Sequence, residues 1–106
     1  MDISFTRGDD HQIKFKFKNF TGTIEKMWFT VKCKNKYVRV QKKLGDGIEL
    51  IDGKYVVTFV PKDTEGLFCD IEMVYDIQII TGGKKYTVLK GEFILDEDVT
   101  TPDCEV

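Results

Sequence analysis

The sequence predicts an all-β fold, a small antiparallel β-sandwich of seven or eight strands with one short helical turn. Three observations support this expectation. Apolar side chains recur at every second position in most strand-like segments, turn-forming residues interrupt these segments at intervals of roughly 8–15 residues, and no segment has the apolar spacing of an amphipathic helix. At 106 residues the chain has the length of one domain. We expect that domain over residues 1–100, followed by a tail over residues 101–106.

The first third of the chain has the clearest alternation. Ile3 and Phe5 predict a first short strand, and lysines alternate with apolar side chains in the second. The third strand has Trp28 on its polar face, which turns inward only if that strand is bulged or covered. The core-facing side chains expected from the second and third strands are Ile13, Phe15, Phe17, Met27, Phe29, Val31 and Cys33.

Two local signals shape the middle of the chain. The Asp52-Gly53 pair predicts a type I′ hairpin turn, because both central residues of that turn need positive φ, which Asp tolerates and Gly adopts freely. Residues 55–60 are β-branched and aromatic and predict the strand that follows. The one helical turn is expected over residues 61–67, which Pro opens and in which Asp63 or Thr64 caps backbone N–H groups.

The longest alternating run covers residues 71–79. The Gly82-Gly83 pair then predicts a turn into two further strands, residues 86–89 and 91–95. The last residues are acidic, contain a proline and lack periodicity, so we expect a frayed tail or one that is held by a neighbouring molecule.

Composition excludes several classes of protein. No apolar stretch approaches the roughly 18 residues of a membrane span, and the first residues lack the basic start of a secretory signal, so we expect cytoplasmic synthesis and no membrane partner. Residues 1–43 carry 11 Lys and Arg against 4 Asp and Glu, whereas residues 44–106 carry 5 against 14. This asymmetry is compatible with solvated faces and also with contacts between oppositely charged patches of neighbouring copies.

Cysteine usage favours reduced thiols. Cys33, Cys69 and Cys104 are odd in number and widely spaced, which does not suit a disulfide framework or a zinc site. A bond between Cys33 and Cys69 is the alternative left open.

The sequence predicts no catalytic, cofactor or metal site. The one histidine, His11, is expected on the surface or in a loop, and an enzyme would require a concave pocket around Asp9, Asp10 and His11. No phosphate-binding glycine motif is present, and the basic strand faces lack the exposed aromatic side chains of a nucleic-acid binder. The Arg7-Gly8-Asp9 tripeptide predicts a turn between the first two strands rather than an adhesion signal.

Segments in a particular order resemble a known family. The order spans most of residues 4–100 and resembles the small immunoglobulin-like β-sandwich modules of tailed-phage virion proteins, including the N-terminal domain of the baseplate upper protein family. In that family the Arg-Gly-Asp segment is a recurring turn and the Asp-Thr pair opens a helical turn. The resembling segments are residues 5–9, residues 53–64, and residues 75–79 leading through a glycine hairpin to residues 89–100.

The resemblance implies a non-enzymatic building block of a phage or prophage virion, located in the baseplate, the tail or a head decoration. Its partners would be copies of itself or other virion proteins, and no nucleic acid. The chain departs from the family before the Trp28 strand, where residues 20–24 read Phe-Thr-Gly-Thr-Ile instead of the usual Asp-Leu-Thr-Gly-Ala type. An adhesion or carbohydrate-binding domain at a cell surface is the alternative, and it predicts exposed aromatic side chains at Trp28, Tyr37 and Phe68.

Two segments are the expected contact regions for an assembling module. Residues 37–41 have modest alternation and many charges, which predicts an edge strand protected from further pairing. The acidic residues 96–105 are long enough to dock on a neighbour. The candidate contact residues are Tyr37, Arg39, Gln41, Asp96, Glu97 and Asp98.

Overall fold

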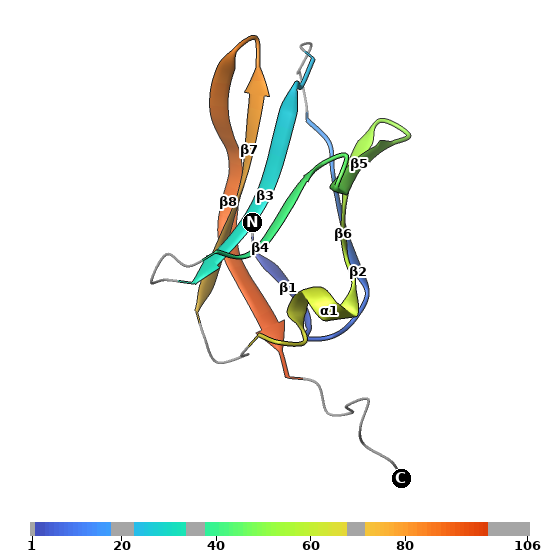
Figure 1. Ribbon diagram of the computed structural model, residues 1–106, viewed down its shortest axis with the longest axis vertical. Helices are drawn as coiled ribbons and strands as arrows, with labels where there is room; N and C mark the ends of the chain where they lie inside the picture. The colour runs from blue at the N-terminus through green and yellow to red at the C-terminus, as the bar shows by residue number, and fades with distance from the viewer. Residues whose placement is uncertain (1, 18–22, 34–37, 68–71, 98–106) are drawn as a thin grey trace.

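The computed structural model describes residues 2–17, 23–33, 38–67 and 72–97, and within these ranges the protein is all-β, as predicted (Figure 1). One four-residue helix, α1 (Pro61–Thr64), interrupts the strands. The eight strands are β1 (Ile3–Thr6), β2 (His11–Phe15), β3 (Lys26–Cys33), β4 (Val38–Leu44), β5 (Gly47–Ile51), β6 (Lys54–Phe59), β7 (Met73–Thr81) and β8 (Lys84–Asp96).

All eight strands form one mixed sheet that is nearly closed into a barrel. Their order is β1-β8-β7-β3-β4-β5-β6-β2. The strands at the two ends of this order, β1 and β2, are consecutive in the chain, so the turn between them brings the ends of the sheet together. Figure 1 shows β8, β7 and β3 on one side of the molecule and β5, β6 and β2 on the other, with α1 across one end.

The prediction of a purely antiparallel sheet is wrong for two strand pairs. β1 runs parallel to β8, and β4 runs parallel to β5. The first pair joins segments about as far apart as the chain allows, and turn chemistry carries no information about such a pairing. The second pair is a short crossover at the Gly45-Asp46 loop, where the chain changes from one side of the barrel to the other. The five remaining pairs are antiparallel.

An aromatic cluster joins the two sides of the barrel. Phe59 of β6 is fully buried, and its ring centroid lies 5.3 Å from that of Phe5, 5.5 Å from Phe29 and 5.8 Å from Phe93. These partners come from β1, β3 and β8. Because each side chain belongs to the apolar phase of its strand, the alternation read from the sequence is what fills this core.

Most predicted core positions are confirmed. Ile13, Met27, Phe29, Val31 and Cys33 are buried. Two others, Phe15 and Phe17, are partly buried and pack against Tyr55, the first stacked on its ring and the second tilted to it.

The predicted turns are also found. Asp52 and Gly53 both have positive φ, +50° and +78°. Residues 86–89 and 91–95 were expected as two strands, but they form one strand, β8, whose register shifts opposite Ile77 and Gln78. A bulge lets a strand bend without ending.

Candidate interaction surface

Among the described residues, β4 pairs with β3 along most of its length but with β5 only at its end. β3 pairs with it from Trp28 opposite Lys43 to Lys32 opposite Val38, whereas β5 pairs only with its last two residues, Lys43 and Leu44. Figure 1 shows β4 meeting β5 at this end. We call residues 38–42 the β4 edge. The predicted edge strand is therefore wrong in sheet order, since β4 lies inside the sheet, but most of its length has an unpaired side among the described residues.

The direction of the β4 backbone groups follows from one hydrogen bond. The N–H of Lys43 donates to the carbonyl oxygen of Asp46 at 2.9 Å, so it points away from β3. Backbone groups two residues apart in a strand point to the same side. The N–H and C=O of Gln41 therefore also point away from β3, toward the side on which the described residues include no paired strand.

The side chains of the β4 edge are exposed and mostly polar. Arg39 and Gln41 are exposed, and Val38 is 52% exposed. The side-chain amide of Gln41 donates to Thr30 Oγ1 of β3 at 3.2 Å. β4 as a whole carries Arg39, Lys42 and Lys43 and no carboxylate, so the edge is basic.

Lys42 closes the space between β4 and α1. It lies in the inward phase of β4, and its Nζ is 2.8 Å from Asp63 Oδ2, with 15% and 16% of the two side chains exposed. The same carboxylate oxygen accepts the N–H of Val60 at 2.8 Å, which caps α1. Asp63 was a predicted capping residue, but its ion pair with Lys42 was not predicted.

Gly47 is required beside the lysine. Its φ is +99°, and a Cβ at this position would lie 2.5 Å from Lys42 Cδ. The aliphatic stem of Lys42 thus passes directly against the backbone of β5 and fills the gap that strand pairing leaves. The lysine replaces strand pairing along this part of the barrel wall.

The opposite side of the barrel, where β1 and β2 do not pair with each other, is closed by a ring contact and hydrogen bonds. Phe5 of β1 stacks on His11 of β2 at 4.4 Å between ring centroids. The N–H of Gly8 in the connecting turn donates to the fully buried hydroxyl of Thr64 at 2.8 Å, and Arg7 donates to the carbonyl oxygen of Leu67 at 3.0 Å. The Arg-Gly-Asp segment is therefore a structural turn held by α1, as expected, with Gly8 at φ +82°.

The expected position of His11 needs correction. It is the first residue of β2 and is partly buried under Phe5, not a loop residue. Asp9 and Asp10 are exposed beside it. Asp9, Asp10 and His11 do not line any of the three hollows described for this structure.

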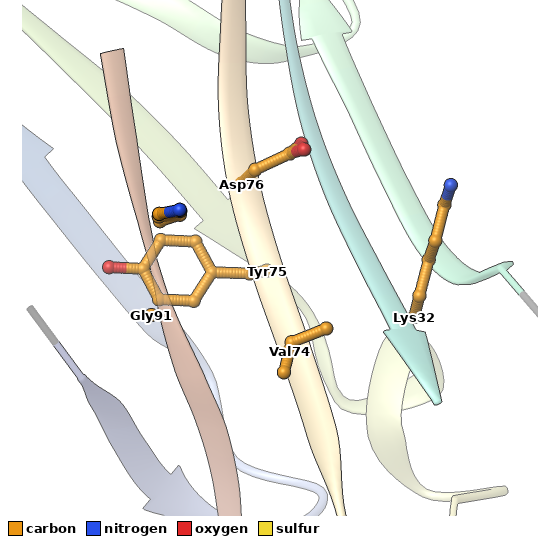
Figure 2. Close-up of a pocket in the computed structure, with 6 residues that line it drawn as sticks. Lys32, Val74, Tyr75, Asp76 and Gly91 are labelled. Atoms are coloured by element: carbon orange, nitrogen blue, oxygen red, sulfur yellow. The ribbon is translucent and has the colours of Figure 1, made fainter. Parts of the chain in front are cut away.

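The outer face of β3, β7 and β8 is hollowed at two places. The first hollow has a volume of about 320 Å³. Gly91 lacks a side chain, and Figure 2 shows the ring of its register partner Tyr75 beside it, with Val74 nearby and Lys32 and Asp76 at the margin. Val74 is 43% exposed and Ile94 on the same face is 41% exposed. Burial and, secondarily, the carboxylate of Asp2 raise the pKa of the Tyr75 hydroxyl.

The second hollow contains the single tryptophan. Trp28 is partly buried, and it lines a space of about 250 Å³ with the polar side chains of Thr30, Gln41, Gln78 and Lys85. The sequence placed Trp28 on the polar face of its strand, and this is where it lies. Its carbohydrate-binding companions in the alternative hypothesis, Tyr37 and Phe68, fall outside the described residues.

The predicted contact residues occupy two separate places. Arg39 and Gln41 lie on the β4 edge, and Asp96 and Glu97 lie exposed at the end of β8. Tyr37 and Asp98 fall outside the described residues. Sequence reasoning missed Lys42, although its place in phase with Val40 and Leu44 marks it as an inward lysine.

Cys33 is the one cysteine among the described residues. Cys33 is a buried free thiol that accepts a hydrogen bond from Arg39 Nε at 3.1 Å, and Cys69 and Cys104 fall outside the described residues. Within the described ranges no three His, Cys, Asp or Glu side chains are grouped to hold a metal ion. The described part of the chain also has no helix long and apolar enough to span a membrane.

Comparison with known proteins adds no relative. No protein-family model matches the chain, and no curated protein matches it either.

Proposed function

We propose that the chain is an immunoglobulin-like module that works by assembly, as a non-enzymatic structural protein of a phage or prophage virion. The strand order supports the fold. In immunoglobulin domains one sheet contains strands B, E and D and the other C, F and G, with an added C′ strand in variable-type domains. Here the neighbouring strands β2, β6 and β5 correspond to B, E and D. The neighbouring strands β3, β7 and β8 correspond to C, F and G, and β4 has the position of C′.

Two features distinguish this module from an antibody domain. β1 pairs with β8 rather than with β2. The strand in the C position carries its tryptophan on the outer face, and Phe29 occupies the core in its place. Many cell-surface and structural domains share the sandwich architecture without the antibody disulfide, so these departures are compatible with the proposed fold.

The open β4 edge is the observation that supports assembly. An unpaired strand edge is a template for another strand, and proteins usually cover or disrupt such edges. This edge is short and basic, which limits indiscriminate pairing and favours a partner with complementary charge. The order of segments shared with phage baseplate modules supports the virion as the place of assembly.

The test is incorporation into particles. A prophage carrying a tagged chain is induced, the particles are purified, and their proteins are identified by mass spectrometry. We expect the chain in stoichiometric amount in the particles, and we expect a Gln41→Pro variant that keeps the native circular dichroism spectrum to be excluded from them. Particles that assemble and infect without the chain would contradict the proposal.

The Trp28 hollow favours one second candidate, a carbohydrate-binding domain. An aromatic ring beside amide and hydroxyl groups is a common way to hold a sugar, since the ring packs on the apolar face and the amides bond to hydroxyls. Titration with host-surface oligosaccharides, followed by the fluorescence of the single tryptophan, tests it. A saturable change that Gln78→Ala abolishes would favour this candidate over assembly.

A further inference from the structure

We infer that the β4 edge of one copy takes the acidic C-terminal segment of a second copy, residues 97–106, as an added strand. This inference rests on the proposed function, in which the β4 edge is an assembly surface, and it names the occupant. The added strand would face the backbone groups of Gln41 that point away from β3. Pairing through an exposed strand edge gives affinity through the main chain, and charge then selects the partner.

Charge complementarity identifies this segment. The exposed cations here are Arg39 on the edge, Lys43 directly after it and Lys32 on the neighbouring strand, whereas Lys42 lies inward beside Asp63. Residues 97–106 contain four acidic residues and no lysine or arginine. Opposite charges placed across neighbouring strands stabilise the pairing, whereas like charges weaken it.

The same rule disfavours pairing of two β4 edges. If two copies paired antiparallel about Gln41, whose backbone groups face the open side, Arg39 of one copy would lie opposite Lys43 of the other. This symmetric contact would bring four cations together along one seam without a carboxylate on either strand. The acidic segment meets the same backbone groups without this repulsion.

Length and composition are compatible with an added strand. β8 ends at Asp96, and the ten following residues reach at most about 35 Å when fully extended. The β4 edge has five residues, about 17 Å of strand, and the five residues before Pro102 are enough to cover it. It contains Val99, Thr100 and Thr101, which are β-branched and favour strands, before Pro102, which ends regular pairing.

The contact would be heterologous, since the edge of one copy binds the tail of another. Such contacts generate rings when the rotation closes and filaments when it does not. Both outcomes suit a virion component that surrounds or follows an axis.

The first experiment measures the mass of the full-length chain by sedimentation velocity over a range of concentrations and salt. We expect concentration-dependent oligomers that dissociate as salt rises. Lys43→Glu should raise the dissociation constant about tenfold or more, as expected for reversal of an interfacial charge. The matched control is Lys14→Glu, which makes the same change at an exposed position on β2 and should leave association unchanged.

The second experiment mixes two full-length variants that should each be monomeric. Gln41→Pro blocks the edge and keeps the tail, whereas Val99→Pro/Thr101→Pro keeps the tail charge and prevents it from pairing. We expect a 1:1 heterodimer on mixing and nothing larger, because one edge and one tail remain competent. Circular dichroism checks that each variant is folded, and Lys43→Glu, used below its raised dissociation constant, replaces Gln41→Pro if the proline variant unfolds.

The outcomes separate this inference from the proposed function. If the tail variant assembles like the parent chain while Gln41→Pro does not, the edge is an assembly surface and the tail is not its occupant. If the parent chain stays monomeric at about 1 mM, which is far above the dissociation constants of specific complexes, the inference is overturned. Incorporation into particles would then still decide the proposed function independently.

Discussion

Different interactions hold the barrel together at two places, where β1 meets β2 and where β4 meets β5. We call these places the β1/β2 seam and the β4/β5 seam. At the β1/β2 seam, a phenylalanine stacks on a histidine and a buried threonine accepts a backbone N–H from the connecting turn. At the β4/β5 seam, strand pairing stops after two residue pairs, and one lysine fills the gap with its stem while its charge is held by Asp63. β1 and β2 do not pair with each other, so these side-chain contacts and hydrogen bonds hold the first seam. At the second seam, the backbone groups of the β4 edge that point away from β3 have no strand partner among the described residues.

This comparison predicts that damage at the first seam costs more stability than damage at the second. Removal of packed aromatic surface or of a buried hydrogen bond affects the folded state of every copy. Removal of an ion pair that is partly exposed affects it less, because water screens the pair and solvates the separated charges.

The largest effect is expected for Phe5→Ala. Phe5 is 8% exposed and contacts His11, Phe59 and Phe93, so its loss opens a cavity between both sides of the barrel. We expect a loss of about 3–5 kcal/mol in the free energy of unfolding, measured by urea denaturation. Phe5→Leu, which keeps most of the apolar volume, should lose clearly less. A loss below about 1 kcal/mol for the alanine variant would show that the seam is not part of the core.

Thr64→Val tests the hydrogen bond of the same seam. Valine has the shape of threonine but cannot accept the N–H of Gly8, which is then partly buried without its partner. We expect a loss of about 1–3 kcal/mol in the free energy of unfolding. Thr64→Ser, which retains the hydroxyl, should recover part of it, and equal losses for the two variants would assign the effect to packing alone.

Lys42→Met tests the second seam. Methionine keeps most of the aliphatic stem against Gly47 but removes the charge that pairs with Asp63, whose carboxylate still accepts the N–H of Val60. We expect a loss of about 1 kcal/mol. Lys14→Met, at an exposed position on β2, is the control and should change stability by less than about 0.5 kcal/mol. A loss for Lys42→Met that exceeds that of Phe5→Ala would reverse the comparison.

The smallest effect is expected from Tyr75 at alkaline pH. Burial and the nearby Asp2 carboxylate raise its pKa above the ordinary value of 10.0. The unfolded chain therefore loses this proton at a lower pH than the folded chain, so the contribution is complete below pH 10 and is lost as the pH rises through the folded pKa. Between pH 9 and 11, Tyr75→Phe should lose less stability than the parent chain. If the two proteins lose the same free energy of unfolding over this pH range, Tyr75 has the same pKa in the folded and the unfolded chain.

The parts of this fold that depend on residues close together in the chain could be predicted from the sequence. Alternation placed Met27, Phe29 and Val31 in the core, and the Asp52-Gly53 pair placed the hairpin, because side-chain phase and turn geometry depend on near neighbours. The parallel pairing of β1 with β8 depends on segments about 90 residues apart, and no local signal encodes it. The antiparallel prediction failed there for this reason.

The candidate surface was predicted in part. The charges of residues 37–41 predicted an edge strand, whereas β4 lies between β3 and β5, and among the described residues β5 pairs only with the last two residues of β4. Its openness results from the crossover at the Gly45-Asp46 loop, which carries the chain away before β5 can pair along β4. The pairing of Lys42 with Asp63 joins two residues 21 positions apart and depends on where the barrel places α1.

Hydrogen exchange at two backbone amides tests the central claim most directly. The N–H of Gly8 donates to a buried hydroxyl, whereas the N–H of Gln41 faces the open side of β4. In dilute, monomeric protein we expect slow exchange at Gly8 and fast exchange at Gln41, and we expect Gln41 to become protected when the protein assembles. Slow exchange at Gln41 in the monomer, or no change on assembly, would contradict the account.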